Sequence, residues 1–166
     1  MTVRAIVKFP NDWLAQPSLP VTEFGPPLEQ LVADMHDTMR SLYGVGIAAV
    51  QIGIHLRVFL IAPNAEQYGV FINPSFEPIG KPTGMPEGCL SYPGIYDRFD
   101  RYLEILAKWT DLSGEQHIGK MDGLFAHAFQ HELNHIDGVS MIDNMLPAAQ
   151  KKLRKRVTRG TYGEAT

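Results

Sequence analysis

The residues best placed to do chemistry form the run His131-Glu132-Leu133-Asn134-His135. Four residues of α-helix turn through about 400°, so the two imidazoles would project from one face about 40° apart. They could then bind one divalent metal ion, with Glu132 beside them as a general base. Because this pattern also occurs by chance on helices with surface histidines, the motif alone leaves both interpretations open.

A third histidine complicates the choice of ligands. His127 lies four residues before His131, so the three histidines share one helical stripe. Only the later pair has a glutamate after its first histidine, since Ala128 follows His127. We therefore assign His131 and His135 as metal ligands, and His127 as a pocket wall or a partly exposed residue. The isolated histidines are predicted to lie outside the site: His36, His55 and His117.

A catalytic metal site usually has three protein ligands and a position left for water. The chain after the motif contains no further histidine, and its carboxylates are weaker candidates: Asp137, Asp143 and Glu164. Cys89, the only cysteine, is the better choice because a thiolate binds iron or zinc strongly. A lone cysteine is more often a small buried apolar residue, and this alternative stays open. Without a second cysteine for a disulfide, the chain is expected in a reducing compartment.

Three helices are expected, one that carries the residues 131–135 motif and two that flank it. Residues 124–136 contain neither proline nor glycine and lie between Gly123 and Gly138, which predicts a helix of about 13 residues. Apolar residues recur with the helical period over residues 28–42, which predicts a second helix. The tail over 148–160 favours a short basic helix with little apolar face.

Short runs of β-type residues alternate with turns. Residues 57–62 and 69–72 are predicted as adjacent strands, and residues 102–110 and 116–119 as a hairpin. Residues 77–86 are rich in proline and glycine, so we expect a loop or an irregular edge strand there. This order of elements predicts an α+β fold, with antiparallel β-sheets packed around the motif-bearing helix and flanking N- and C-terminal helices.

The chain has the size and apolar content of a single domain over residues 1–166. With 45% hydrophobic residues it can bury roughly 70% of its unfolded surface. A net charge of −3 gives no general case for binding DNA or a membrane surface. The N-terminus shows no signal or transit peptide, and no apolar run approaches about 18 residues, so a cytoplasmic protein is expected.

Three segments together resemble the motifs of peptide deformylases of the compact bacterial type: 44–51 (GVGIAAVQ), 87–91 (EGCLS) and 130–135 (QHELNH). Alone, the first segment matches a dinucleotide-binding fingerprint, but that fold needs a strand before the glycines, where a helix is predicted here. The resemblance implies a metal-dependent hydrolase that removes the N-formyl group from the initiator methionine of nascent polypeptides and releases formate. The implied cofactor is one divalent metal ion, with Fe(II) favoured and Zn, Ni or Co suitable.

The resemblance also implies a role for each site residue. The thiolate and the two imidazoles assigned above would bind the metal, and Glu132 would transfer the proton. The Gln51 amide and the Leu90 backbone N–H would stabilise negative charge on the reacting oxygen. The Gly46 backbone would pair with the substrate peptide as an added strand. The residues expected to contact the substrate are Val45, Gly46, Gly88, Tyr96, Leu124, His127 and Ala128.

Three positions depart from the family pattern. Asn134 stands where the family commonly has an aspartate that pairs with an arginine, which aligns here with Arg101. Glu87 is a second candidate partner for that arginine. Loss of such a partner often costs about 10- to 100-fold in metal affinity or activity, so we expect reduced but real activity. Tyr96 replaces a frequent arginine near the substrate cleft, and His127 replaces an aliphatic residue of the pocket.

Two other functions fit the same residues. An HExxH endopeptidase would cut internal amides of unformylated peptides. An inactive relative would only bind peptide N-termini or ribosomes, although the intact Glu132 argues against it. The basic tail is either a solvated helix face or a ribosome-docking element attracted by phosphates. Its cations are Lys151, Lys152, Arg154, Lys155, Arg156 and Arg159.

Overall fold

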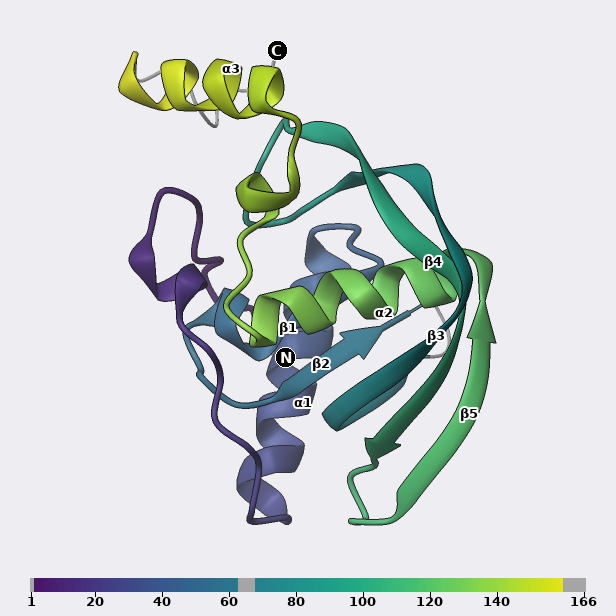
Figure 1. Ribbon diagram of the computed structural model, residues 1–166. Coiled ribbons are helices and arrows are strands. Elements are labelled where there is room, and N and C mark those ends of the chain that lie inside the picture. Colours follow the sequence, from purple (N-terminus) through teal and green to yellow (C-terminus); the bar gives the residue numbers. More distant parts are fainter. Residues whose placement is uncertain (1, 63–67, 160–166) are drawn as a thin grey trace.

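The fold comes from a computed structural model and is described for residues 2–62 and 68–159 (Figure 1). The α-helices in these residues are α1 (Pro26–Ser41), α2 (Gly123–Ile136) and α3 (Pro147–Thr158). The strands are β1 (Gly46–Ala48), β2 (Val58–Ile61), β3 (Gly69–Gly88), β4 (Tyr96–Thr110) and β5 (Gln116–Asp122). Short 3₁₀ turns cover Asp12–Ala15, Ala49–Ile52 and Met141–Asn144. All three predicted helices are confirmed.

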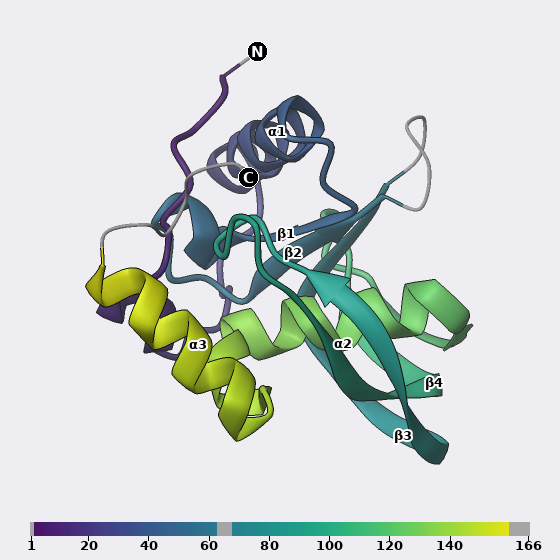
Figure 2. The ribbon, with the colours of Figure 1, turned by 90° about the horizontal axis from the view of Figure 1, so that it is seen from above.

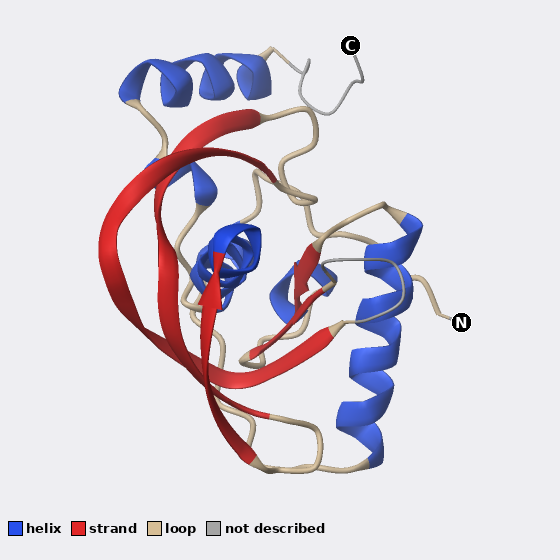
Figure 3. Ribbon diagram, turned by 90° about the vertical axis from the view of Figure 1, so that its right-hand side faces the viewer, coloured by secondary structure: helices blue, strands red, loops and turns tan. Residues whose placement is uncertain are grey.

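The five strands form one antiparallel sheet in the order β1-β2-β3-β4-β5. The predicted adjacent strands are β2 and the start of β3, and the predicted hairpin is β4 with β5. β3 and β4 bend strongly, so that the sheet curves around α2 (Figure 3). The predicted α+β class, with antiparallel strands around the motif-bearing helix, is confirmed.

The proline-rich segment 77–86 belongs to β3, so the predicted loop is wrong and the edge strand is the correct alternative. The segment pairs with β4 throughout, ending with Pro86 opposite Arg98, and a register shift within it marks a bulge. β2 pairs with β3 only as far as Ile72. In the described part of the chain, one side of this segment therefore has no strand partner. Proline, which lacks an N–H donor, is tolerated on such an edge.

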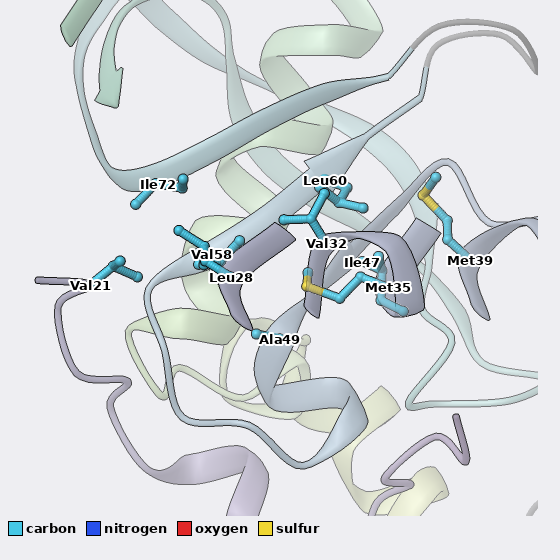
Figure 4. Packing of buried hydrophobic residues seen from close by; sticks show 10 residues of the cluster. All are labelled: Val21, Leu28, Val32, Met35, Met39, Ile47, Ala49, Val58, Leu60 and Ile72. Atoms are coloured by element: carbon cyan, nitrogen blue, oxygen red, sulfur yellow. The ribbon is translucent and has the colours of Figure 1, made fainter. Parts of the chain in front are cut away.

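β1, the 3₁₀ turn that follows it and β2 lie between α1 and α2, and their side chains alternate between the two helices. One set belongs to the cluster on α1 (Figure 4): Ile47, Ala49, Val58 and Leu60. The residues between them belong to the cluster on α2: Ala48, Val50, Phe59 and Ile61. Because successive side chains of a strand point to opposite faces, a strand covered on both faces is apolar throughout. This accounts for the uninterrupted apolar run of β2.

α2 lies at the centre of the molecule and is buried on most sides. Its apolar residues Ala126, Phe129 and Ile136 are fully buried, and the Phe129 ring meets Phe59 edge-on with centroids 5.0 Å apart. The helix ends as predicted before Gly138, whose φ of 72° lies in the left-handed region that favours glycine. The other buried residues of α2 are polar: His127, Gln130, His131, Glu132 and His135. Since buried polar groups need partners or a ligand, this face marks the candidate site.

α3 is an outer helix (yellow in Figure 2) with a narrow apolar side. Leu153 is buried in a cluster with Tyr92 and Met145. Most cations of α3 are exposed, and Arg156 is half-buried. Among the described residues, no helix has the length and apolar character needed to cross a membrane.

Candidate metal centre

The end of β3 and the middle of α2 bring one thiol and two imidazoles together. A ligand atom from each of Cys89, His131 and His135 lies within 4.8 Å of the other two. Cys89 Sγ is 3.1 Å from His135 Nε2, and the imidazole rings of His131 and His135 are 4.9 Å apart between centroids. The three residues predicted as ligands therefore meet at one point. A thiolate with two imidazoles is a donor set suited to Fe(II), Zn, Co or Ni.

Glu87 orients one of the two imidazoles. Its Oε1 accepts hydrogen bonds from His131 Nδ1 and from Arg101 Nη2, both at 2.8 Å. Its Oε2 accepts a hydrogen bond of 3.1 Å from Arg101 Nε. Burial alone would raise the pKa of Glu87, but contacts from His127, His131 and Arg101 hold that pKa well below its usual value. With Nδ1 of His131 bound to a carboxylate, its Nε2 is left for a metal ion.

Asn134 takes part in the same network. Its Oδ1 accepts a short hydrogen bond from Arg101 Nη1, which also donates to the Gln130 carbonyl oxygen at 3.3 Å. The neutral amide therefore contacts Arg101 as the family's aspartate does, but without a negative charge. Arg101 instead pairs with the Glu87 carboxylate as its ionic partner.

The surroundings of the two imidazoles shift their pKa values in opposite directions. Burial lowers the pKa of both rings, and for His135 the charge of His131 lowers it further. For His131, burial is outweighed by hydrogen bonds to Cys89 and Glu87, so its pKa lies well above the usual value. The thiol and the Glu87 carboxylate are therefore the neighbours that favour positive charge beside His131.

Glu132 is buried next to the ligands. Burial raises its pKa to about 7, although the charge of His131 acts in the opposite direction. Its Oε2 has no hydrogen-bond partner among the described residues. A Cβ on Gly46 would lie only 2.3 Å from Glu132 Oε1, so a larger residue there would force the carboxylate to move. Sequence reasoning had assigned Gly46 to the substrate alone and had missed this packing role.

The side-chain amide of Gln51 lies beside the thiol of Cys89. Its Oε1 accepts a hydrogen bond of 2.8 Å from the Ala48 N–H, which fixes the direction of the side chain. Its Nε2 lies 3.2 Å from Ser91 Oγ and 3.5 Å from Cys89 Sγ. Leu90 follows the cysteine in a turn, so its backbone lies beside the thiol.

A cavity of about 830 Å³ opens beside these groups. All seven predicted substrate-contacting residues line it: Val45, Gly46, Gly88, Tyr96, Leu124, His127 and Ala128. Tyr96 is 81% exposed at the rim, and its ring packs against Gly88. The N-terminal segment from Val3 to Ile6, together with Lys8, also lines the cavity. The sequence analysis missed this segment, because it carries no motif and only the fold brings it there.

The remaining histidines fall into two groups. His127 is 3% exposed, so the predicted partial exposure is wrong; it lines the cavity, and its Nε2 lies 2.7 Å from Glu87 Oε2. The isolated histidines lie away from the centre: His36 stacks on Tyr68, His117 stacks on Trp109, and His55 contacts Trp13 with its ring tilted. Asp137 forms an ion pair with Arg57, and Glu164 lies outside the described residues.

A family model described as polypeptide deformylase matches residues 3–151. The chain belongs to the polypeptide deformylase family. The peptide deformylase of Novosphingobium aromaticivorans is 37% identical, with 93% of this chain and 99% of that protein covered.

Solved structures of deformylases share the fold. The crystal structure of a peptide deformylase from Legionella pneumophila is 32% identical with a TM-score of 0.90, covering 96% of this chain and 95% of that chain. The peptide deformylase from Ehrlichia chaffeensis in complex with actinonin is 30% identical with a TM-score of 0.88, covering 96% and 98%. These matches confirm the family, the fold class and the peptide deformylase activity predicted from the sequence.

Proposed function

We propose that this deformylase hydrolyses the N-terminal formamide of N-formylmethionyl peptides, releasing formate and a free α-amine. The observation that carries the proposal is the meeting of a thiol and two imidazoles beside the buried Glu132, at the wall of a large cavity. Residues 1–166 would act as one catalytic domain. A reducing, cytoplasmic compartment suits the single free cysteine, Cys89.

The cofactor would be one divalent metal ion held by Cys89, His131 and His135. The fit is supported by the donor set and by the contact of His131 Nδ1 with Glu87. Fe(II) is favoured, and Zn, Ni or Co also suit a thiolate and two imidazoles. Such an ion supplies Lewis acidity that activates water and polarises a carbonyl group.

The proton transfers would be carried by Glu132. As a carboxylate it would accept a proton from the attacking water, and as the acid it would return that proton to the leaving amine. A pKa of about 7 suits both steps at neutral pH. The Gln51 amide, held by its contact with Ala48, and the Leu90 backbone N–H would donate to the oxygen on which negative charge develops.

The peptide would lie along β1. This strand is at the edge of the described sheet, so an extended substrate can pair with the Gly46 backbone. The rim of the cavity exposes apolar side chains at Val45, Leu124 and Tyr96, which suit contact with the first residues of a peptide. The methionine side chain would enter the cavity between Val45 and the start of α2.

The test is a formate-release assay on anaerobically purified protein of known metal content. A formyl-Met peptide should release formate, and an unformylated peptide with only internal amides should stay intact. Glu132→Ala should lower kcat by about 10²- to 10⁴-fold with metal retained, whereas Glu77→Ala, an exposed acid on β3, should not. Cleavage of the internal amides would favour the endopeptidase alternative. Near-normal turnover by the Glu132→Ala variant would exclude Glu132 as the base.

We also propose that α3 contacts the ribosome, because its exposed cations form a surface suited to phosphates. A variant reversing three exposed charges should lose salt-sensitive ribosome binding but keep formate release: Lys151→Glu, Lys152→Glu and Lys155→Glu. The control reverses three lysines of the sheet: Lys81, Lys108 and Lys120. If both variants bind the ribosome equally well, α3 has no role in docking and its cations are only a solvated face.

A further inference from the structure

The N-terminal segment forms one side of the cavity. Residues Val3 to Ile6 and Lys8 line it. The two residues on either side of Lys8 donate their backbone N–H groups to the carbonyl oxygens of Gln51 and Ser91, at 2.8 and 2.9 Å. The backbone at Lys8 is therefore held close to Gln51, whose amide the proposed function places at the reacting carbonyl.

Lys8 carries a charge that is not balanced within the cavity. It is exposed and has no ion-pair partner among the described residues. Arg4, the other cation that lines the cavity, is paired with Asp34 through Nη2 and Oδ2 at 2.7 Å. The glutamates and histidines that line the cavity are buried. Within the described part of the chain, Lys8 is thus the one exposed and unpaired charge of the cavity, on a rim that also exposes apolar residues such as Leu42 and Val45.

The fold places this segment on the opposite side of β1 from α2. β1 lies between the α1 cluster and the α2 cluster, and Ile6 packs on the α1 cluster. The Arg4 N–H also donates to Thr38 Oγ1 of α1 at 2.9 Å. The proposed function directs the first side chain of the peptide toward the start of α2. Because successive side chains of an extended chain point to opposite sides, the second side chain would point toward the N-terminal segment.

We propose that Lys8 is a specificity-determining residue, which favours formylated peptides whose second residue is acidic. The inference rests on the proposed function and defines its substrate class more closely. The carboxylate of an aspartate or glutamate at that position would form an ion pair with the Lys8 ammonium group, whereas a lysine or arginine would be repelled. The pair would remain in contact with water at the rim, so its effect is modest and sensitive to salt.

The experiment compares second residues of opposite charge. Formate release is measured at low and at high ionic strength on formyl-Met-Ala, formyl-Met-Glu and formyl-Met-Lys peptides, otherwise identical and amidated at the C-terminus. The enzymes are the unaltered protein, Lys8→Arg, Lys8→Ala and Lys8→Glu, with equal metal content. Lys81→Glu is the matched control, because Lys81 is an exposed lysine of β3 that does not line the cavity.

We expect the unaltered enzyme at low ionic strength to have a kcat/KM about fivefold higher for the glutamate peptide than for the lysine peptide. The difference should be in KM, since the ion pair is present equally before and during the reaction, and it should shrink at high ionic strength. Lys8→Arg and Lys81→Glu should keep the ratio within about twofold, Lys8→Ala should bring it close to equality, and Lys8→Glu should reverse it.

Two results would overturn the inference while leaving the proposed function intact. One is equal kcat/KM of the unaltered enzyme for the glutamate and lysine peptides at low ionic strength. The other is a preference for glutamate that persists in Lys8→Ala and Lys8→Glu, which would assign the selection to another group. Absence of formate release from the neutral formyl-Met-Ala peptide would instead refute the proposed function, and the inference with it.

Discussion

Replacing Gly46 by alanine should disable the base while leaving the metal ligands in place. A Cβ at this position would lie 2.3 Å from Oε1 of Glu132 and 2.9 Å from its Cδ. Non-bonded heavy atoms are most stable about 3.5 Å apart, so the carboxylate must move by about 1 Å. A displacement of that size can lower the rate about 10²-fold. Glu132 is buried beside the metal ligands, so a shifted carboxylate would no longer be aligned with them, and we expect kcat to fall about 100-fold.

The assay is formate release from a formyl-Met peptide at saturating concentration, with metal content measured on the same sample. KM should change little, because alanine keeps the backbone groups that pair with the peptide. Gly84→Ala is the matched control, since Gly84 is also in a strand and a Cβ there would meet only exposed side chains, Asp100 at 3.2 Å and Arg98 at 3.6 Å. A Gly46→Ala enzyme with full metal content and unaltered kcat would refute the close packing of β1 on Glu132.

Three further substitutions test other parts of the structure. Cys89→Ala should lose most of its metal as well as its activity, measured by metal analysis after gel filtration, and full metal content would remove the thiol from the site. Asn134→Asp should tighten metal binding by about 10-fold in a chelator competition, because a charged partner would hold Arg101 more firmly; unchanged affinity would mean that Glu87 alone suffices. Phe129→Ala should lower the free energy of unfolding by about 3–5 kcal/mol in urea titration, whereas a loss below about 1 kcal/mol would contradict its full burial.

The sequence predicted those parts of the site that depend on local spacing. The helical placement of His131 and His135 follows from four residues of helix, and Glu132 is adjacent to the first of them. Cys89 was predicted as the third metal ligand because its sulfur is a soft donor and the chain offers few other candidate ligands. Its distance of 3.1 Å from His135 Nε2 is a property of the fold, since it joins residues 46 positions apart.

The sequence did not predict contacts made between distant segments. The pairing of His127 with Glu87 joins α2 to β3, and neither residue carries a local sign of it. The packing of Gly46 on Glu132 likewise depends on how β1 crosses α2. The prolines of residues 77–86 left two alternatives open, because proline reports a missing donor but not which side of a strand lacks a partner.

The central claim is that one sulfur and two imidazole nitrogens hold a single divalent ion. X-ray absorption spectroscopy of the zinc-loaded protein tests it most directly, because the method distinguishes sulfur from nitrogen neighbours. One sulfur at about 2.3 Å and two imidazole nitrogens at about 2.0–2.1 Å are expected, with the sulfur absent in Cys89→Ala. A metal shell made only of nitrogen and oxygen in the unaltered protein would contradict the claim.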